Sequence, residues 1–262
     1  MFWHVGRSDQ ILSRSNAQQM IPDHYHYLLI NLLTIAYPLA QSYERRLRFL
    51  KNWKAIFTAT AIVGGIFLAW DELFTALEVW GFNERYLIGI YIGRLPLEEY
   101  NFFLTVPFAC LFIYEVLNYF IKKDLLKNYH QSITFFFLLC TLFLGTYFSP
   151  KLYTTICFYF TAVVLSLQFF FFKNDWMGRF YLGYFVSLIP FLIMNGWLTG
   201  SFTEEPIVWY NNMHNMGLRI GTVPAEDAMY LLGYLLAVTM IYERVKRKNL
   251  AMHSDQNYRS TS

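Results

Sequence analysis

A segment of this chain occurs twice, at residues 89–115 and again at 217–243. The copies align without a gap, with Gly89 opposite Gly217, and ten of their 27 positions are identical. Each carries the pattern Gly-x-x-Pro-x-Glu-acid directly before an apolar run of helix length. Internal repetition restricts the architecture, because each copy of a repeat folds into the same structural unit. The sequence therefore predicts two equivalent halves, each with a pair of acids at the start of a helix.

Long apolar runs indicate a membrane protein. Of the 262 residues, 56% are hydrophobic and only 15% are charged, whereas about a quarter of an average soluble domain is charged. A helix that crosses a bilayer needs about 20 apolar residues. Runs that meet or approach this length lie at 24–42, 55–76, 100–120, 132–148, 152–172, 179–199 and 225–243. We expect an all-α integral membrane fold with seven transmembrane helices, six or eight being the alternatives.

Basic residues are distributed unevenly between these helices. Of the 21 Lys and Arg residues, 15 lie on one side of the predicted bundle, in segments 45–54, 122–127, 173–179 and 244–259. Cytoplasmic loops of membrane proteins carry such an excess. We therefore expect the N-terminus outside and the C-terminus in the cytoplasm, in a multi-pass protein of a prokaryotic plasma membrane. The same rule accounts for the basic residues without a nucleic-acid partner.

The repeat also predicts how the helices are grouped. The alignment of the two copies, extended along the chain, maps the first three spans onto the last three and leaves the fourth without a counterpart. Three helices reverse the direction of a chain across the membrane and a linker helix restores it, so the halves should be parallel repeats whose acids face one cavity. The predicted domains are a polar extension at 1–21, repeats at 22–128 and 151–246, a linker helix at 129–150 and a polar cytoplasmic tail at 247–262.

Glu98, Glu99, Glu226 and Asp227 are the first candidates for a functional role. Proline followed by acids also starts a helix well and complements its dipole, so a capping role alone remains an alternative. Capping does not, however, require the same acids twice. A carboxyl group at membrane depth costs roughly 2.5–3.5 kcal/mol on insertion scales and is a functional candidate by default. In an apolar cavity such a group can stay protonated and act as a general acid.

Five further residues are candidates for substrate binding or for support of these acids. Pro96 and Pro224 precede the two acid pairs. Asp71 is expected at the same membrane level, and its alternative is a position in the interfacial aromatic belt. Asn195 is expected near that level on another helix, where a helix–helix hydrogen bond is its ordinary role. His214 is expected in an outer loop, as a base, a hydrogen-bond partner or neither.

Two repeated acids are expected to be structural. Glu115 and Glu243 follow Glu99 and Asp227 by 16 positions, which is about 24 Å along a helix. That distance places them near the cytoplasmic face, where we expect them to pair with basic loop residues.

Several kinds of chemistry lack the residues that they need. The chain has no GxGxxG motif after a strand, no cluster of His in a span, no Lys in the last span and no Asp-rich pair. A dinucleotide or flavin fold, a His-ligated iron site, a retinal Schiff base and magnesium–diphosphate binding are therefore not expected. We predict no cofactor and no metal, which leaves proton-driven chemistry on a neutral lipid. Some of the 26 Phe and 20 Tyr rings could stabilise a carbocation.

The segments PLEEYNFF at 96–103 and PAEDAMY at 224–230 resemble the lycopene cyclases of the heterodimeric or fused type. The resemblance implies a fused chain in which an acid protonates the terminal C1=C2 bond of a ψ-end and C5=C6 attacks the tertiary cation. A base then removes a proton, from C6 for a β-ring or from C4 for an ε-ring. It implies Glu98 and Glu226 as the candidates for acid and base, in either order, with Glu99 and Asp227 as their partners. Lycopene, the bilayer and other enzymes of the carotenoid pathway are the implied partners.

Three functions are consistent with these patterns. The first is a lycopene cyclase that forms β-rings, giving β-carotene by way of γ-carotene. The second is an ε-ring or C50-carotenoid cyclase on the same scaffold. The third is a transporter or lipid-binding protein, in which parallel repeats and paired acids would form a proton-coupled site.

Overall fold

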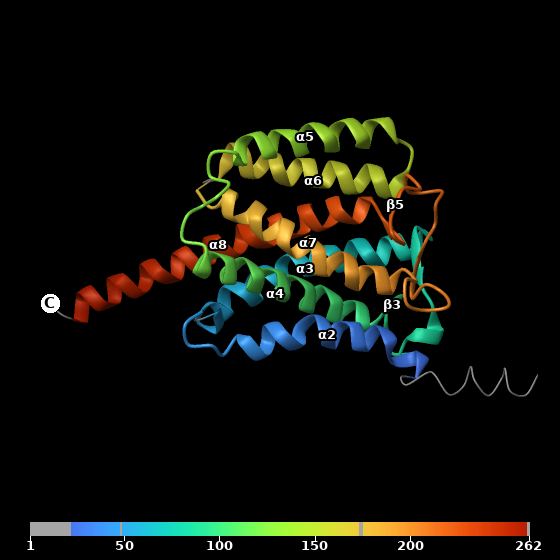
Figure 1. Cartoon of the computed structure of the whole chain (residues 1–262), viewed down its shortest axis with the longest axis horizontal. Coiled ribbons are helices and arrows are strands. Elements are labelled where there is room, and N and C mark those ends of the chain that lie inside the picture. Colours follow the sequence, from blue (N-terminus) through green and yellow to red (C-terminus); the bar gives the residue numbers. More distant parts are fainter. Residues whose placement is uncertain (1–21, 48, 173–174, 261–262) are drawn as a thin grey trace, which may run out of the picture.

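The apolar runs of the chain form helices, because a chain in lipid must satisfy its backbone hydrogen bonds internally. The structure, a computed structural model, describes residues 22–47, 49–172 and 175–260. Within these ranges, seven α-helices run alternately in opposite directions through one bundle (Figure 1). Their bounds are α2 His26–Gln41, α3 Trp53–Ala76, α4 Leu97–Phe120, α5 His130–Tyr147, α6 Leu152–Phe171, α7 Met177–Leu198 and α8 Glu226–Ser260. The polar extension expected at 1–21 lies outside the described residues.

Six of the seven helices are long and apolar enough to cross a membrane. The shorter one is α2, which has 16 residues and contains Pro38. Its axis measures about 24 Å, less than a hydrocarbon core of about 30 Å. A short 3₁₀-helix, η1 Asp23–Tyr25, precedes it, and two others are η2 Phe49–Asn52 and η3 Glu84–Tyr86. The fold is that of an all-α membrane protein, with six long apolar helices where the sequence predicted seven spans.

The helices pack in a pattern that repeats between the halves. The α2 helix packs on α4 as α6 packs on α8, and the alignment of the repeat relates these two pairs. The α3 helix of the first half packs on α8 of the second, and α7 packs on α4 in the matching way. The unmatched α5 packs on α6 at one edge of the bundle, whereas α2 forms the opposite edge (Figure 1). The two repeated helices, α4 and α8, therefore lie in contact at the centre.

A small hairpin precedes each central helix and explains the repeated glycine. Strands β2 (Tyr91–Ile92) and β3 (Leu95–Pro96) form the first, and β5 (Arg219–Ile220) and β6 (Val223–Pro224) form the second. Gly93 and Gly221 have φ angles of 65° and 66°. A two-residue hairpin loop needs a positive φ at this position, which favours glycine. The motif thus encodes a turn that delivers the chain, through proline, into a helix.

A second strand pair joins the halves at the same end of the bundle. Strand β1 (Trp80–Phe82) pairs antiparallel with β4 (Val208–Tyr210), and Gly81 lies opposite Trp209. These two residues occupy equivalent positions in the aligned halves, so the two strands pair through matching positions of the repeat. A side chain at Gly81 would meet the Trp209 indole. No strand was expected here from the sequence.

The opposite end of the bundle is tied together by reciprocal contacts between α4 and α8. The Tyr114 hydroxyl donates to Glu243 Oε1 at 3.0 Å, and the Tyr242 hydroxyl donates to Glu115 Oε1 at 2.9 Å. Glu115 also pairs with Lys246, 2.5 Å away. The structural role expected for the two acids is confirmed, although their basic partners lie on α8 and not in a loop.

Candidate active site

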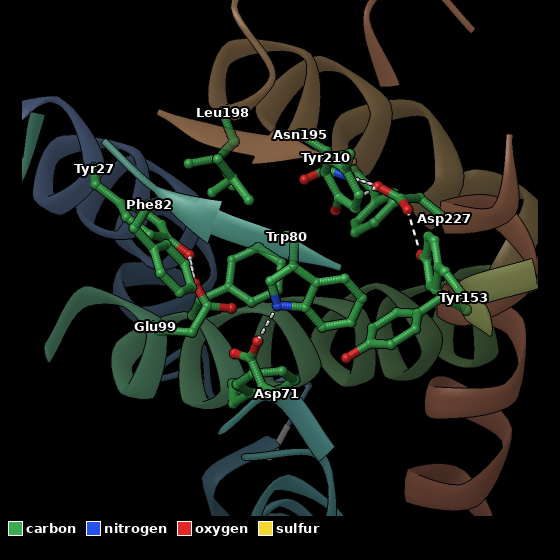
Figure 2. A pocket seen from close by; sticks show the side chains of 15 residues that line it. Tyr27, Asp71, Trp80, Phe82, Glu99, Tyr153, Asn195, Leu198, Tyr210 and Asp227 are labelled. Atoms are coloured by element: carbon green, nitrogen blue, oxygen red, sulfur yellow. Dashed lines mark hydrogen bonds between the residues drawn. The ribbon is translucent and has the colours of Figure 1, made fainter. Parts of the chain in front are cut away.

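A cavity lies where the strand pair β1–β4 meets the ends of the central helices, and its volume is about 50 Å³. Acids from both halves face it, because each hairpin delivers the first turn of α4 or α8 to this point. The residues that line it are Tyr27, Asp71, Trp80, Phe82, Glu99, Phe102, Phe103, Tyr153, Phe191, Asn195, Leu198, Val208, Tyr210, Asp227 and Tyr230. In the view of Figure 2, Glu99 and Asp71 lie on one side, Asp227 on the other and the Trp80 indole between them.

Three hydrogen-bond donors surround the Asp227 carboxyl group. The Tyr153 hydroxyl donates to Oδ1 at 2.5 Å, and the Asn195 amide donates to Oδ2 at 2.6 Å. The Tyr210 hydroxyl also donates to Oδ2, at 3.2 Å. Burial and the neighbouring Asp227 carboxylate raise the pKa of Tyr210 well above its ordinary value, so this phenol remains a donor. Hydrogen bonds to a carboxylate favour its charged form.

The Glu99 carboxyl group has a different environment. Its Oε2 accepts a hydrogen bond from the Tyr27 hydroxyl, and its carboxyl group lies against that of Asp71. The Trp80 indole donates to Asp71 Oδ1. Within the described part of the chain these two acids have two donors between them, whereas Asp227 alone has three. Two carboxyl groups in contact cannot both be ionised easily.

Glu98 and Glu226 lie outside the cavity lining, although both are fully buried. Glu98 Oε1 accepts from the backbone N–H of Ile88 at 2.7 Å, and Glu226 Oε1 accepts from that of Met216 at 2.6 Å. Each bond reaches ten positions back, to the segment that enters the hairpin. The glutamate that the two copies share thus fastens the hairpin to the helix that follows it.

The remaining sequence-derived candidates divide between these environments. Asp71 and Asn195 line the cavity, and Asn195 forms an interhelical hydrogen bond from α7 to α8. Pro96 and Pro224 end the strands before α4 and α8. His214 lies outside the cavity lining, and its carbonyl accepts from the Tyr153 backbone N–H at 2.9 Å.

A sequence model of the lycopene cyclase family matches residues 24–117 and 150–245. The chain belongs to the lycopene cyclase family. The two matched regions cover the two halves and leave out α5, consistent with a fused lycopene cyclase of two halves. Comparisons with curated proteins and with solved structures give no match. Family membership supports a carotenoid cyclase that acts on a lipophilic carotenoid and is embedded in a membrane as a multi-pass protein.

The donors that distinguish the two acidic centres of this lycopene cyclase family member were not predicted from the sequence. Tyr27, Trp80, Tyr153 and Tyr210 belong to a chain in which 20% of the residues are aromatic, so composition does not single them out. One signal was available for Tyr210, because its counterpart in the first half is Phe82. A hydroxyl present in one half and absent in the other marks a position where the repeat is not symmetric. Among the described residues, no group of three or more His, Cys, Asp or Glu could hold a metal ion.

Proposed function

We propose that this chain is a lycopene cyclase that converts the ψ-ends of lycopene to β-rings, giving γ-carotene and then β-carotene. The observation that carries the proposal is the meeting of two unlike acidic centres, one from each half, in one aromatic cavity. Cyclisation needs a proton donor at one end of the reacting group and a proton acceptor at the other. A duplicated scaffold whose halves differ at this position meets that need.

We assign the proton donor to the pair formed by Glu99 and Asp71. A pair of carboxyl groups that shares one proton can deliver it to an alkene, because the remaining negative charge is then spread over both groups and their donors. The proton adds to C2 of the ψ-end and leaves a tertiary cation at C1. The π electrons of C5=C6 form the C1–C6 bond and move the cation to C5.

We assign the proton acceptor to Asp227. Three donors favour its carboxylate form, which is the form that can remove a proton from C6. The electrons of that C–H bond become the C5=C6 double bond of the β-ring, so the reaction is balanced without a redox cofactor. The product has the mass of the substrate, and the enzyme returns to its starting state when a proton passes from Asp227 back to the acidic pair.

The aromatic wall supports a cationic intermediate. Trp80, Phe103 and Tyr230 line the cavity together with the acids, and a ring face attracts a cation by about 2 kcal/mol or more when water is absent. Exclusion of water also prevents capture of the cation as an alcohol. We propose positioning roles for Glu98, Glu226, Pro96 and Pro224, and treat His214 as part of the loop that holds Tyr153.

We further propose seven membrane crossings in two parallel halves, with the domain bounds that the sequence predicts, the N-terminus outside and the C-terminus in the cytoplasm of a prokaryote. Two observations support this topology. The helices alternate in direction, and 15 of the 21 basic residues lie in segments at one end. The short α2 helix would cross together with η1, with local thinning of the bilayer around it.

The pigment profile of lycopene-accumulating bacteria that express the chain tests this function. We expect γ-carotene and β-carotene at unchanged mass in water, and one deuteron in each new ring when the protein in nanodiscs converts unlabelled lycopene in D₂O. An ε-ring product would mean that the proton is removed from C4 and not from C6. Cyclisation of a longer carotenoid alone would mean that the substrate is not lycopene. If lycopene stays unconverted although the protein is folded and inserted in the membrane, and vesicles show pH-driven uptake, the transporter function would replace the cyclase function.

A further inference from the structure

An apolar groove continues from the candidate active site between α2, α4 and α7. Its volume is about 360 Å³, and it shares Phe102, Phe191 and Asn195 with the cavity. The cavity itself, of about 50 Å³, is much smaller than the groove. Most of a carotenoid must therefore lie elsewhere. We propose that this groove binds the unreacted polyene arm of the substrate, a linear hydrocarbon, and admits it from the bilayer. This inference rests on the proposed function.

The shape and chemistry of the groove fit a linear hydrocarbon. On α4 its lining extends from Phe102 to Leu117, which is about 22 Å along a helix. None of the described residues that line it is charged. On α2, Leu33 and Tyr37 form the outer wall and are 46% and 68% exposed. On the side of a membrane bundle such exposure is to lipid, so the groove opens laterally to the solvent in which a carotenoid is dissolved.

Two prolines inside helices lie on this groove. Pro38 of α2 and Pro190 of α7 both line it. Proline within a helix removes one backbone hydrogen bond and displaces the preceding turn, which hinders close packing of two helices. The matching positions of the other half are Ser166 and Ile62. Prolines within these helices thus lie on the groove between α2, α4 and α7 and are absent from the matching positions of the other half.

The matching groove of the other half, between α6, α8 and α3, is filled by side chains. The alignment of the repeat places Tyr234 where α4 has Val106, and Phe67 where α7 has Asn195. The Phe67 ring centre lies 4.5 Å from that of Tyr234 and 5.1 Å from that of Phe160. Rings at these separations are in contact, so they leave no channel for a polyene. One arm can therefore be bound at a time, and the second ring requires release and rebinding.

Substitutions that fill the groove test its role. Val106→Tyr introduces the residue of the closed half, and Ala109→Phe fills the groove one turn further along. Leu104→Tyr is the matched control, because Leu104 is 41% exposed and lies outside the groove lining. Each full-length variant is placed in lipid nanodiscs with lycopene, and total bound carotenoid is measured by chromatography beside conversion. We expect about tenfold less bound carotenoid in both groove variants, since overpacked sites exclude their ligand, and wild-type amounts in the control.

The two readouts separate this inference from the proposed function. If wild-type protein binds lycopene without forming a ring while the groove variants lose binding, the proposed cyclase function is wrong and the binding role of the groove is kept. If folded groove variants bind and convert lycopene as the wild type does, the binding role of the groove is wrong and the proposed function is kept.

A measurement on the unmodified protein covers the case in which the variants do not fold. A linear hydrocarbon that carries a diazirine is photolysed with wild-type protein in nanodiscs, and the attachment sites are mapped by peptide mass spectrometry. We expect lycopene to suppress attachment to residues 102–117 of α4 and to leave the lipid-facing attachment to α5 unchanged. Equal suppression on both helices, or none on α4, would contradict binding of the polyene arm in the groove.

Discussion

At the starts of α4 and α8, the same hairpin and the same buried glutamate precede two acids that have different partners. Glu99 lies against a second carboxyl group, whereas Asp227 is held by three donors. The backbone bonds to Glu98 and Glu226 are nearly equal in length, at 2.7 and 2.6 Å. The duplicated scaffold has therefore kept its backbone contacts and changed its side chains where the chemistry is proposed to occur. Such a division gives one cavity both a proton donor and a proton acceptor.

The strongest test of this comparison removes the acceptor. Asp227→Asn keeps the shape of the side chain but cannot take a proton, and loss of a general base lowers rates by about 10²–10⁴-fold. We expect β-carotene formation to fall by about three orders of magnitude while bound lycopene stays at the wild-type amount. The check is conversion and bound carotenoid, measured on the same nanodisc sample. Cyclisation at more than a tenth of the wild-type rate would remove Asp227 from the reaction.

The next test removes the two halves of the donor pair separately. Glu99→Gln should lower conversion by about 10²–10³-fold, because one acid of the proposed proton donor is lost. Asp71→Asn leaves Glu99 in place and should lower it by about 10–10²-fold. The double variant should be no worse than Glu99→Gln alone, since residues that act as a unit are not additive. Additive losses in initial rates would show that the two carboxyl groups act independently.

The third test asks whether the buried glutamates of the repeat take part in the reaction or only hold the hairpin against the helix that follows it. Glu98→Gln and Glu226→Gln keep an oxygen that accepts from the backbone, so we expect conversion to fall by less than about tenfold. Glu98→Ala and Glu226→Ala leave a backbone N–H unpaired, which costs about 1–3 kcal/mol and should lower the unfolding temperature as well as activity. The resemblance to the family predicts the opposite for the glutamine variants, namely loss of all cyclisation with protein level and membrane insertion intact.

The sequence predicted the two-half organisation but not which acid of each pair reaches the cavity. The apolar runs and the repeat identify helices because both signals extend over many turns of a helix. Glu98 and Glu99 are neighbours, and successive side chains of a helix point about 100° apart. Their directions depend on how α4 is rotated in the bundle, which tertiary contacts determine. The pair β1–β4 has only three residues in each strand, too few for a period-two pattern.

The last test makes the second centre resemble the first. Tyr210→Phe introduces the residue found at the matching position, Phe82, and removes the longest of the three bonds to Asp227. A hydrogen bond to a charged group contributes about 1.5–3 kcal/mol. Because Tyr153 and Asn195 remain, we expect the lower limit of this range, which is a loss of about tenfold in conversion. A deuteron should still be delivered to each ring.

Tyr159→Phe is the matched control, since that hydroxyl bonds to Thr146 outside the cavity lining. Equal losses in the two variants would mean that the third donor has no part in the difference between the centres. A loss confined to Tyr210→Phe would show that divergence from Phe82 is one of the substitutions that separate the base from the acid.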